Sequence, residues 1–371
     1  MKEKIKILWV TNAFGCGGAE RQMLYMYQIL QERCNFDITI LYYAKVGDAL
    51  DIDGVKTVFF DKEKIGGFAV IKEIAKYIRQ NNIDIMHAFG GCSANIYGRA
   101  GAALCRKVIP VGAMLGKKHF AGRANKYINS LLNLFGNWWT INNLEMEPIL
   151  RRDLRFVSKE RIKLLHNGFI PAERIDYHTE EKTEYDRDKG SQFVFTVLGR
   201  LAPVKNYGLF IKAAAQIAQK YENTRFWVIG NGSEAENLQQ LAEDCGVADK
   251  VRFWGYRTDT DVALSRSDVF VQTSFTEGSP NTIAEAMRAR KPIISTQSTD
   301  LSEMIRQGEN GFVVANDNLP ELVSAMETLL EMSPQQRQKA GEVSYELFKE
   351  NFLDCRVAAE FEKFYHEILG R

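Results

Sequence analysis

The chain has 371 residues, 45% of them hydrophobic and 26% charged, so it is too long for one typical domain and has the composition of an ordinary globular protein. No apolar run approaches the roughly 18 residues that a membrane-spanning helix needs, and the first apolar run ends too early for a signal peptide. The six cysteines include no C-x-x-C pair, which argues against a zinc site or a disulfide framework and predicts a cytoplasmic protein.

The net charge of +1 conceals an asymmetry between the two halves of the chain. Residues 1–170 contain 25 Lys and Arg against 15 Asp and Glu, whereas residues 171–371 contain 23 against 32. Uneven surface charge is one explanation. The other is a first domain that faces something anionic, such as a lipid phosphate or a membrane surface. We expect no nucleic-acid partner.

The first half of the chain alternates apolar runs of strand length with helical patterns, and a glycine-rich turn that contains Gly17 and Gly18 follows the first run. Alternation of this kind predicts a parallel, doubly wound sheet whose ligands bind at the carboxyl ends of the strands. The predicted strands are residues 6–10, 37–42, 55–60, 83–88, 108–114 and 138–142.

A polar, aperiodic stretch at residues 171–191 predicts a linker, after which the alternation restarts. We therefore predict an α/β protein with two doubly wound domains, at residues 1–170 and 192–350, and a cleft between them. The strands predicted in the second domain are residues 193–198, 225–229, 251–253, 269–272 and 292–295. The predicted helices between them are residues 210–219, 235–245 and 280–290, and the chain is mostly helical after about residue 330.

Residues 274–287 join a predicted strand to a predicted helix, and two carboxylates, Glu277 and Glu285, bracket the junction. Gly278 lets the backbone approach a ligand closely, and the N–H groups at the start of the helix favour phosphate. An ordinary strand–loop–helix corner with solvated glutamates explains this stretch equally well when it is considered alone.

Three more residues follow predicted strands, at the edge where such a sheet binds ligands. Arg200 and Lys205 come after the first strand of the second domain, where two cations suit a diphosphate, although a solvated basic loop is the alternative. His87 ends a strand of the first domain. A lone histidine is more often structural than catalytic, and its position at a strand end is what favours a functional role.

Two further segments have competing explanations. Asp259-Thr260-Asp261 looks like a metal-binding D-x-D, but it precedes an apolar helical pattern, so capping of that helix explains it better and we predict no essential metal. Residues 117–135 mix basic and aromatic residues with an apolar helical pattern. They form either a core helix with a basic loop or an amphipathic surface that meets anionic lipid or a phosphorylated acceptor.

Nearly the whole chain resembles family 4 of the glycosyltransferases, which are retaining enzymes with two Rossmann-like domains facing each other across a cleft, the GT-B architecture. Gly199-Arg200-Leu201 with Lys205 resembles the family's G-R-L-x-x-x-K, and residues 274–287 resemble its S-x-x-E-G-x-P-x-x-x-x-E-A. Residues 308–314 also fit. In the first domain the match is looser, at residues 17–20, 84–87 and 167–168.

The resemblance implies roles for particular residues. Arg200 and Lys205 would neutralise the donor diphosphate, and Glu277 would contact the transferred sugar. Glu285 would hold the ribose hydroxyls, and His87 would lie near the reacting sugar. The implied donor-binding set is Gly17, Gly18, Arg200, Lys205, Glu277, Gly278, Ser279, Asn281, Thr282 and Glu285. A last helix, residues 351–371, would cross back onto the first domain.

The resemblance thus implies a cytoplasmic, metal-independent retaining glycosyltransferase that uses a UDP- or GDP-sugar and no cofactor. Its acceptor would be a glycan or a lipid-linked saccharide of the cell envelope, and the enzyme would be peripheral to an anionic membrane. A nucleotide-sugar epimerase or hydrolase and a non-catalytic sugar-nucleotide binder are the alternatives. Phe89, Gly116, His166 and Ser279 depart from residues frequent in the family, and the first three leave the acceptor and the sugar open.

Overall fold

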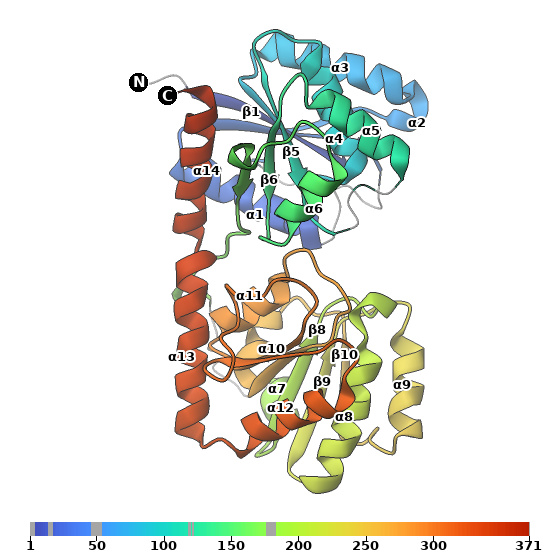
Figure 1. Cartoon of the computed structure of the whole chain (residues 1–371). Helices are drawn as coiled ribbons and strands as arrows, with labels where there is room; N and C mark the ends of the chain where they lie inside the picture. The colour runs from blue at the N-terminus through green and yellow to red at the C-terminus, as the bar shows by residue number, and fades with distance from the viewer. Residues whose placement is uncertain are drawn as a thin grey trace. The chain divides into compact units, whose positions relative to one another are not determined.

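The computed structural model describes residues 4–13, 18–45, 54–117, 120, 122–175 and 183–370. The chain forms two compact units (Figure 1). The first unit consists of Met1–Gly168 and Asp354–Arg371, and the second of Phe169–Leu353. Within the described ranges, no helix combines the length and the apolar character that crossing a bilayer would require.

The first unit alternates strands and helices and is completed by a helix from the end of the chain. Its strands are β1 (Ile5–Ala13), β2 (Phe36–Ala44), β3 (Thr57–Phe59), β4 (Ile85–Ala88), β5 (Ile109–Met114), β6 (Trp138–Ile141) and β7 (Ile162–Leu164). Its α-helices are α1 (Gly18–Arg33), α2 (Lys62–Ile65), α3 (Gly67–Asn81), α4 (Cys92–Ala103), α5 (Arg123–Leu132), α6 (Met146–Asp153) and α14 (Asp354–Leu369).

The seven strands of the first unit form a parallel sheet in the order β3-β2-β1-β4-β5-β6-β7. The side chains of β1 alternate between its two faces, as strand geometry requires. Ile7 and Trp9 pack on one face with residues of α1 and α14. Leu8 and Val10 pack on the other with residues of α3 and α4. Because both faces are covered, residues 7–10 of β1 are all apolar, which is why the middle of the strand reads as a continuous hydrophobic run.

The second unit repeats the pattern. Its strands are β8 (Phe193–Leu198), β9 (Thr224–Ile229), β10 (Val251–Gly255), β11 (Val269–Gln272), β12 (Ile293–Thr296) and β13 (Gly311–Val314). Its α-helices are α7 (Glu184–Lys189), α8 (Tyr207–Lys220), α9 (Ala235–Asp244), α10 (Thr260–Arg266), α11 (Asn281–Arg288), α12 (Leu319–Glu331) and α13 (Pro334–Asn351).

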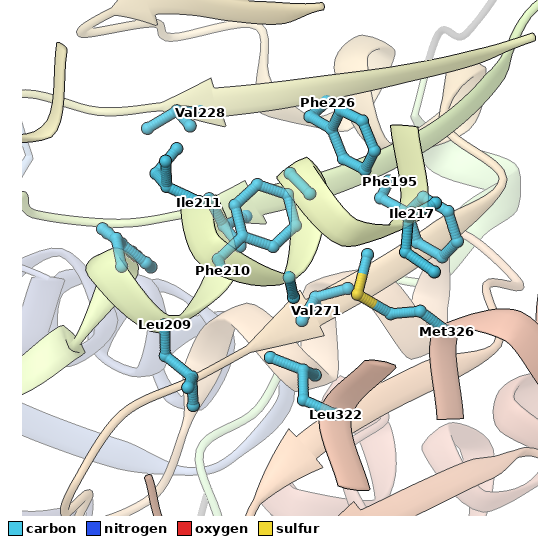
Figure 2. Packing of buried hydrophobic residues seen from close by; sticks show 14 of the residues in the cluster. Phe195, Leu209, Phe210, Ile211, Ile217, Phe226, Val228, Val271, Leu322 and Met326 are labelled. Atoms are coloured by element: carbon cyan, nitrogen blue, oxygen red, sulfur yellow. The ribbon is translucent and has the colours of Figure 1, made fainter. Parts of the chain in front are cut away.

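The six strands of the second unit are parallel and ordered β10-β9-β8-β11-β12-β13. In β9, Phe226 and Val228 pack into the cluster formed with α8 and α12, part of which Figure 2 shows around Phe210. Trp227 and Ile229 point to the opposite face and pack with α10, α11 and α13. The sheet is therefore buried on both sides, and only its edges and strand ends are left for ligands.

The structure differs from the expectation for residues 171–191. Residues 176–182 lie outside the described part, but Glu184–Lys189 form α7, with a capping box between Thr183 and Asp186. Tyr185 is buried against Trp227 and Trp254. The end of the expected linker is thus part of the second unit, because one aromatic anchor in a polar stretch is enough to dock a short helix.

Candidate functional site

The second unit has its topological switch point between β8 and β11. These strands are hydrogen-bonded neighbours, but the chain leaves β8 toward β9 on one side and leaves β11 toward β12 on the other. Loops that diverge from adjacent strand ends leave a crevice between them, where open α/β sheets bind ligands. The loop after β8 carries Arg200 and Lys205, and the loop after β11 carries Glu277.

Lys205 and Glu277 form an ion pair at this point, with 2.7 Å between Lys205 Nζ and Glu277 Oε1. The two side chains are only 19% and 14% exposed, so the pair is partly shielded from water. The backbone holds the loops together as well, since Phe275 N–H donates to Val204 O at 2.9 Å and Thr273 Oγ1 donates to Lys205 O at 2.9 Å. The loops after β8 and β11, about 70 residues apart in the sequence, are thus held together as one surface.

Glycines allow this close approach of loops. Gly199 has φ +144°, and a Cβ there would lie 2.9 Å from the Tyr207 hydroxyl. Gly230, with φ +136°, would place a Cβ 1.9 Å from Gly199 O. The loops after β8 and β9 therefore touch through backbone, which only glycine permits. Burial, followed by the charge of Glu277, raises the pKa of Tyr207, so this hydroxyl stays neutral beside the ion pair.

The helix α11 begins directly after Gly278, Ser279 and Pro280. Pro280 occupies the N-cap position, and its side chain makes no capping hydrogen bond. The positive end of the helix dipole and the first N–H groups of the helix favour an anion. Thr282 Oγ1 donates to Gln272 Oε1 at 3.2 Å, which ties the first turn to the end of β11.

Asn281 and Glu285 lie one helical turn apart on α11, and both side chains are half-buried. Residues at this spacing share a helix face. Arg200 is exposed and makes no hydrogen bond or ion pair with any residue of the described ranges. The second unit thus brings Arg200, Lys205, Glu277 and the start of α11 to one edge of one sheet. That edge offers cations and a helix N-terminus to an anion, with carboxylates beside them.

Sequence reasoning missed the residues that support this edge. Ser298 O accepts from Glu277 N–H at 3.2 Å, and Ser298 Oγ accepts from Gln272 Nε2 at 3.4 Å. Asn316 Nδ2 donates to Phe275 O at 3.2 Å. Ser298 and Asn316 follow β12 and β13, so the rule that ligand-edge residues follow strands would have selected them.

His87, which the resemblance places near the reacting sugar, is a core residue of the first unit. Its ring is fully buried. Trp9 Nε1–H donates to the Tyr365 hydroxyl at 3.0 Å, and that hydroxyl lies 2.8 Å from His87 Nδ1. His87 Nε2 lies 2.8 Å from Thr140 Oγ1, which donates onward to a main-chain carbonyl.

This chain of donors assigns the proton to Nε2 and leaves Nδ1 of His87 as an acceptor, so the ring is neutral. Burial lowers the pKa of His87 to about 3, in agreement with that assignment. The network joins α14, through Tyr365, to strands β1, β4 and β6. His87 therefore fastens the last helix to the sheet, which is the structural alternative that the sequence left open.

The first-unit glycines of the expected donor-binding set are only partly described. Gly17 lies outside the described residues, and Gly18 is the first residue of α1. Neither a contact nor a role for them follows from the structure.

The D-x-D carboxylates have protein partners. Asp259 pairs with Arg257 at 2.7 Å and accepts from the Tyr185 hydroxyl at 3.1 Å, while Asp261 pairs with Arg288 at 2.6 Å. Asp259 does occupy the N-cap position of α10, but its side chain makes no capping hydrogen bond, which corrects the capping explanation. Among the described residues, no group of three or more His, Cys, Asp or Glu side chains is placed to hold a metal ion.

Comparison with known proteins agrees with this geometry. Residues 179–346 match the model of the family described as glycosyl transferases group 1. A lipopolysaccharide core biosynthesis glycosyltransferase, LpsE of Rhizobium meliloti, is 35% identical over 133 residues, which are 36% of this chain and only 38% of that protein. An Escherichia coli UDP-Gal:alpha-D-GlcNAc-diphosphoundecaprenol alpha-1,3-galactosyltransferase is 26% identical over 87% of both chains.

Solved structures share the fold along the whole chain. Anabaena HepE in complex with UDP superposes with a TM-score of 0.84 and 19% identity, covering 98% of this chain and 100% of that one. Its complex with UDP-glucose gives a TM-score of 0.81 at the same identity, over 98% and 99% of the two chains. Residues 179–346 thus resemble the glycosyl transferases group 1 family, and the two units have the GT-B fold of these solved structures.

Proposed function

We propose that the chain transfers a sugar, with retention of anomeric configuration, from a UDP- or GDP-sugar to a glycan or a lipid-linked saccharide acceptor, without a metal or other cofactor. The observation that carries the proposal is the Lys205–Glu277 pair at the β8–β11 switch point, beside the N-terminus of α11. In the proposal, the Lys205 cation faces the negative charge of the sugar diphosphate. The Glu277 carboxylate faces the positive charge that develops on the sugar.

In the proposed reaction, the bond between the anomeric carbon and a diphosphate oxygen breaks while the acceptor hydroxyl oxygen bonds to that carbon. The hydroxyl proton passes to the departing diphosphate. Lys205, Arg200 and the N–H groups at Gly278 to Thr282 would stabilise the charge that grows on the diphosphate. Glu277 would stabilise the positive charge on the sugar. Retention and proton transfer to the diphosphate are inferred from the family resemblance.

The proposal needs no metal, because the positive charge that a metal would supply to the diphosphate is offered by two cations and a helix N-terminus. Glu285 is proposed to bind the ribose, one turn further along α11. UDP is the first nucleotide to test, since HepE is solved with UDP and with UDP-glucose. A lipid-linked saccharide is the first acceptor to test, since the Escherichia coli relative is named for a diphosphoundecaprenol acceptor.

The test is a thermal-shift screen of UDP, GDP and their sugars, followed by transfer assays with the nucleotide that stabilises the protein. A ligand bound only by the native state raises its stability by an amount that grows with concentration. Turnover that persists in a chelator, with product of retained configuration, supports the proposal. Nucleotide release at an equal rate without any acceptor would show a hydrolase or epimerase, and binding without turnover on any acceptor would show a binding protein; either result refutes the proposal.

A further inference from the structure

The helix α5 of the first unit is turned with its polar side inward and its apolar side outward. Asn129, Ser130 and, just after the helix, Asn133 are buried, at 0%, 6% and 4% exposure. On the opposite side Tyr127 and Phe135 are 66% and 64% exposed. A surface helix of a globular protein normally buries its apolar stripe, so this arrangement is the reverse of the usual one.

The inverted orientation is held by buried hydrogen bonds. Arg99, on α4, is 1% exposed, donates to Asn133 Oδ1 and, at 2.7 Å, to Gly136 O, and stacks on Trp139. Trp139 Nε1–H also donates to Asn133 Oδ1, at 3.0 Å. Rotating α5 to bury its apolar side would withdraw Asn133 from the Arg99 guanidinium and from Trp139 in the protein interior, and an unpaired buried charge is strongly unfavourable. The structure therefore fixes the apolar side toward the outside.

A second segment, next to the end of α5, carries one more exposed apolar side chain. Asn133 Nδ2 donates to Arg155 O at 2.7 Å, and Arg155 N–H donates to Ser130 Oγ at 2.9 Å, so the chain after α6 lies against the end of α5. The next residue, Phe156, has φ +63°, a conformation that is uncommon for a bulky residue, and is 57% exposed. The α5 surface, as we define it, consists of Tyr127, Ile128, Leu131, Leu134, Phe135 and Phe156.

Cations accompany the α5 surface. Arg123 begins the helix and is exposed, and Arg155 is exposed on the segment that packs against it, whereas Arg152 is also exposed but pairs with Asp153 at 3.0 Å. The sequence contains no Asp or Glu between Asp84 and Glu145. A cluster of six large exposed apolar side chains is an interaction site rather than ordinary surface. Lys118, His119 and Ala121, which precede α5, lie outside the described residues.

We propose that the α5 surface docks the first unit on an anionic lipid bilayer. The combination of aromatic and aliphatic side chains with arginines suits the boundary between headgroups and acyl chains, where the apolar side chains are buried and the cations meet lipid phosphate. The inference rests on the proposed function, because a bilayer is where an enzyme would meet a lipid-linked acceptor. It names the surface and the chemistry of that partner.

The experiment is co-sedimentation of the full-length protein with vesicles of phosphatidylcholine alone or mixed with phosphatidylglycerol. We expect binding to the mixed vesicles that weakens as salt is raised. Replacing Leu131 and Leu134 together by Gln should weaken binding by at least about tenfold, because fully burying one leucine side chain is worth roughly 1.5–3 kcal/mol. Arg123→Gln with Arg155→Gln should weaken it about fivefold for each cation lost.

The matched control is Phe68→Ser, which removes the most exposed large hydrophobic of the described residues, at 72%, from α3 of the same unit. It should bind vesicles like the parent. Each variant must keep the parent's circular dichroism spectrum and thermal unfolding, which report that the first unit is folded. Parent protein that ignores anionic lipid, or an α5 variant that binds like the parent, overturns the inference. So does sedimentation velocity showing a dimer that Leu131→Gln with Leu134→Gln dissociates, because the surface would then bind a second copy.

Vesicle binding is measured without donor or acceptor, so the two proposals fail separately. The Lys205→Ala variant should bind vesicles as the parent does while losing transfer. Vesicle binding by a protein that transfers no sugar would remove the proposed function and leave the docking surface in place. Transfer without vesicle binding would do the opposite.

Discussion

Removing the Lys205 ammonium tests the candidate donor site most directly. Lys205 Nζ lies 2.7 Å from Glu277 Oε1, and both side chains are less than one-fifth exposed. Lys205→Ala therefore leaves a partly buried carboxylate without its cation, which we expect to lower the free energy of unfolding of the second unit by about 1–3 kcal/mol. It also removes a charge from the place where diphosphate charge would grow, so we expect kcat to fall by about 10²–10³.

The control is a similar ion pair on the same sheet, at the end where the strands begin. Lys189 Nζ lies 2.7 Å from Asp268 Oδ2, with side chains 25% and 26% exposed, and Asp268 directly precedes β11. Lys189→Ala should lower the melting temperature by a comparable amount but leave the affinity for UDP unchanged. Any effect of Lys205→Ala that Lys189→Ala shares is thus a stability effect.

The assays are calorimetric titration with UDP, transfer kinetics with the donor that stabilises the protein, and thermal unfolding of each variant. Glu277→Gln adds a second comparison, because it keeps the shape of the side chain and removes its charge. We expect it to lose turnover while it retains most of the UDP affinity. Turnover close to that of the parent in Lys205→Ala, measured on folded protein, would refute the assignment of this edge as the donor site.

Three further predictions follow from the geometry. Because burial lowers the pKa of His87 to about 3, this residue contributes stability that is present above its unfolded pKa of about 6.5 and is lost as the pH falls toward 3, by about 1.4 kcal/mol per pH unit. In urea titrations, His87→Gln should therefore be less stable than the parent at pH 7. Between pH 6.5 and 5 its free energy of unfolding should depend less steeply on pH than that of the parent, and an equal slope would contradict the neutral, buried ring. Gly230→Ala should destabilise the second unit and weaken UDP binding, since its Cβ would lie 1.9 Å from Gly199 O. Gly246, at φ +67°, has nothing within 4 Å of the position that a Cβ would take, so Gly246→Ala should lower the free energy of unfolding by only about 1 kcal/mol and leave UDP binding unchanged. Equal effects of Gly230→Ala and Gly246→Ala would exclude a steric clash at Gly230 as the cause. Glu285→Ala should weaken binding of UDP more than binding of inorganic diphosphate in calorimetry, and equal losses would argue against a ribose contact.

The sequence alone was sufficient for most of the strands and for the loops that carry the candidate site. Strands such as β1 and β9 are buried on both faces, so they appear as continuous apolar runs that can be recognised locally. Arg200, Lys205 and Glu277 were selected because they follow such runs, and the parallel alternation places strand ends at one edge of a sheet. Two short edge strands, β7 and β13, were missed; the three half-buried residues of β7 form no apolar run.

Only the tertiary structure decided which strand ends are neighbours and which faces are covered. Lys205 and Glu277 are 72 residues apart in the sequence. They meet because β8 and β11 are neighbours in the sheet, although β9 and β10 lie between them in the sequence. His87 stands at a strand end, yet Tyr365 from the last helix closes over it, which no local pattern reveals. The same holds for α5. Its periodicity shows that one side is apolar and the other polar, but the buried Arg99 determines that the polar side faces in. Periodicity is a property of the segment, whereas burial depends on partners that lie far away in the sequence.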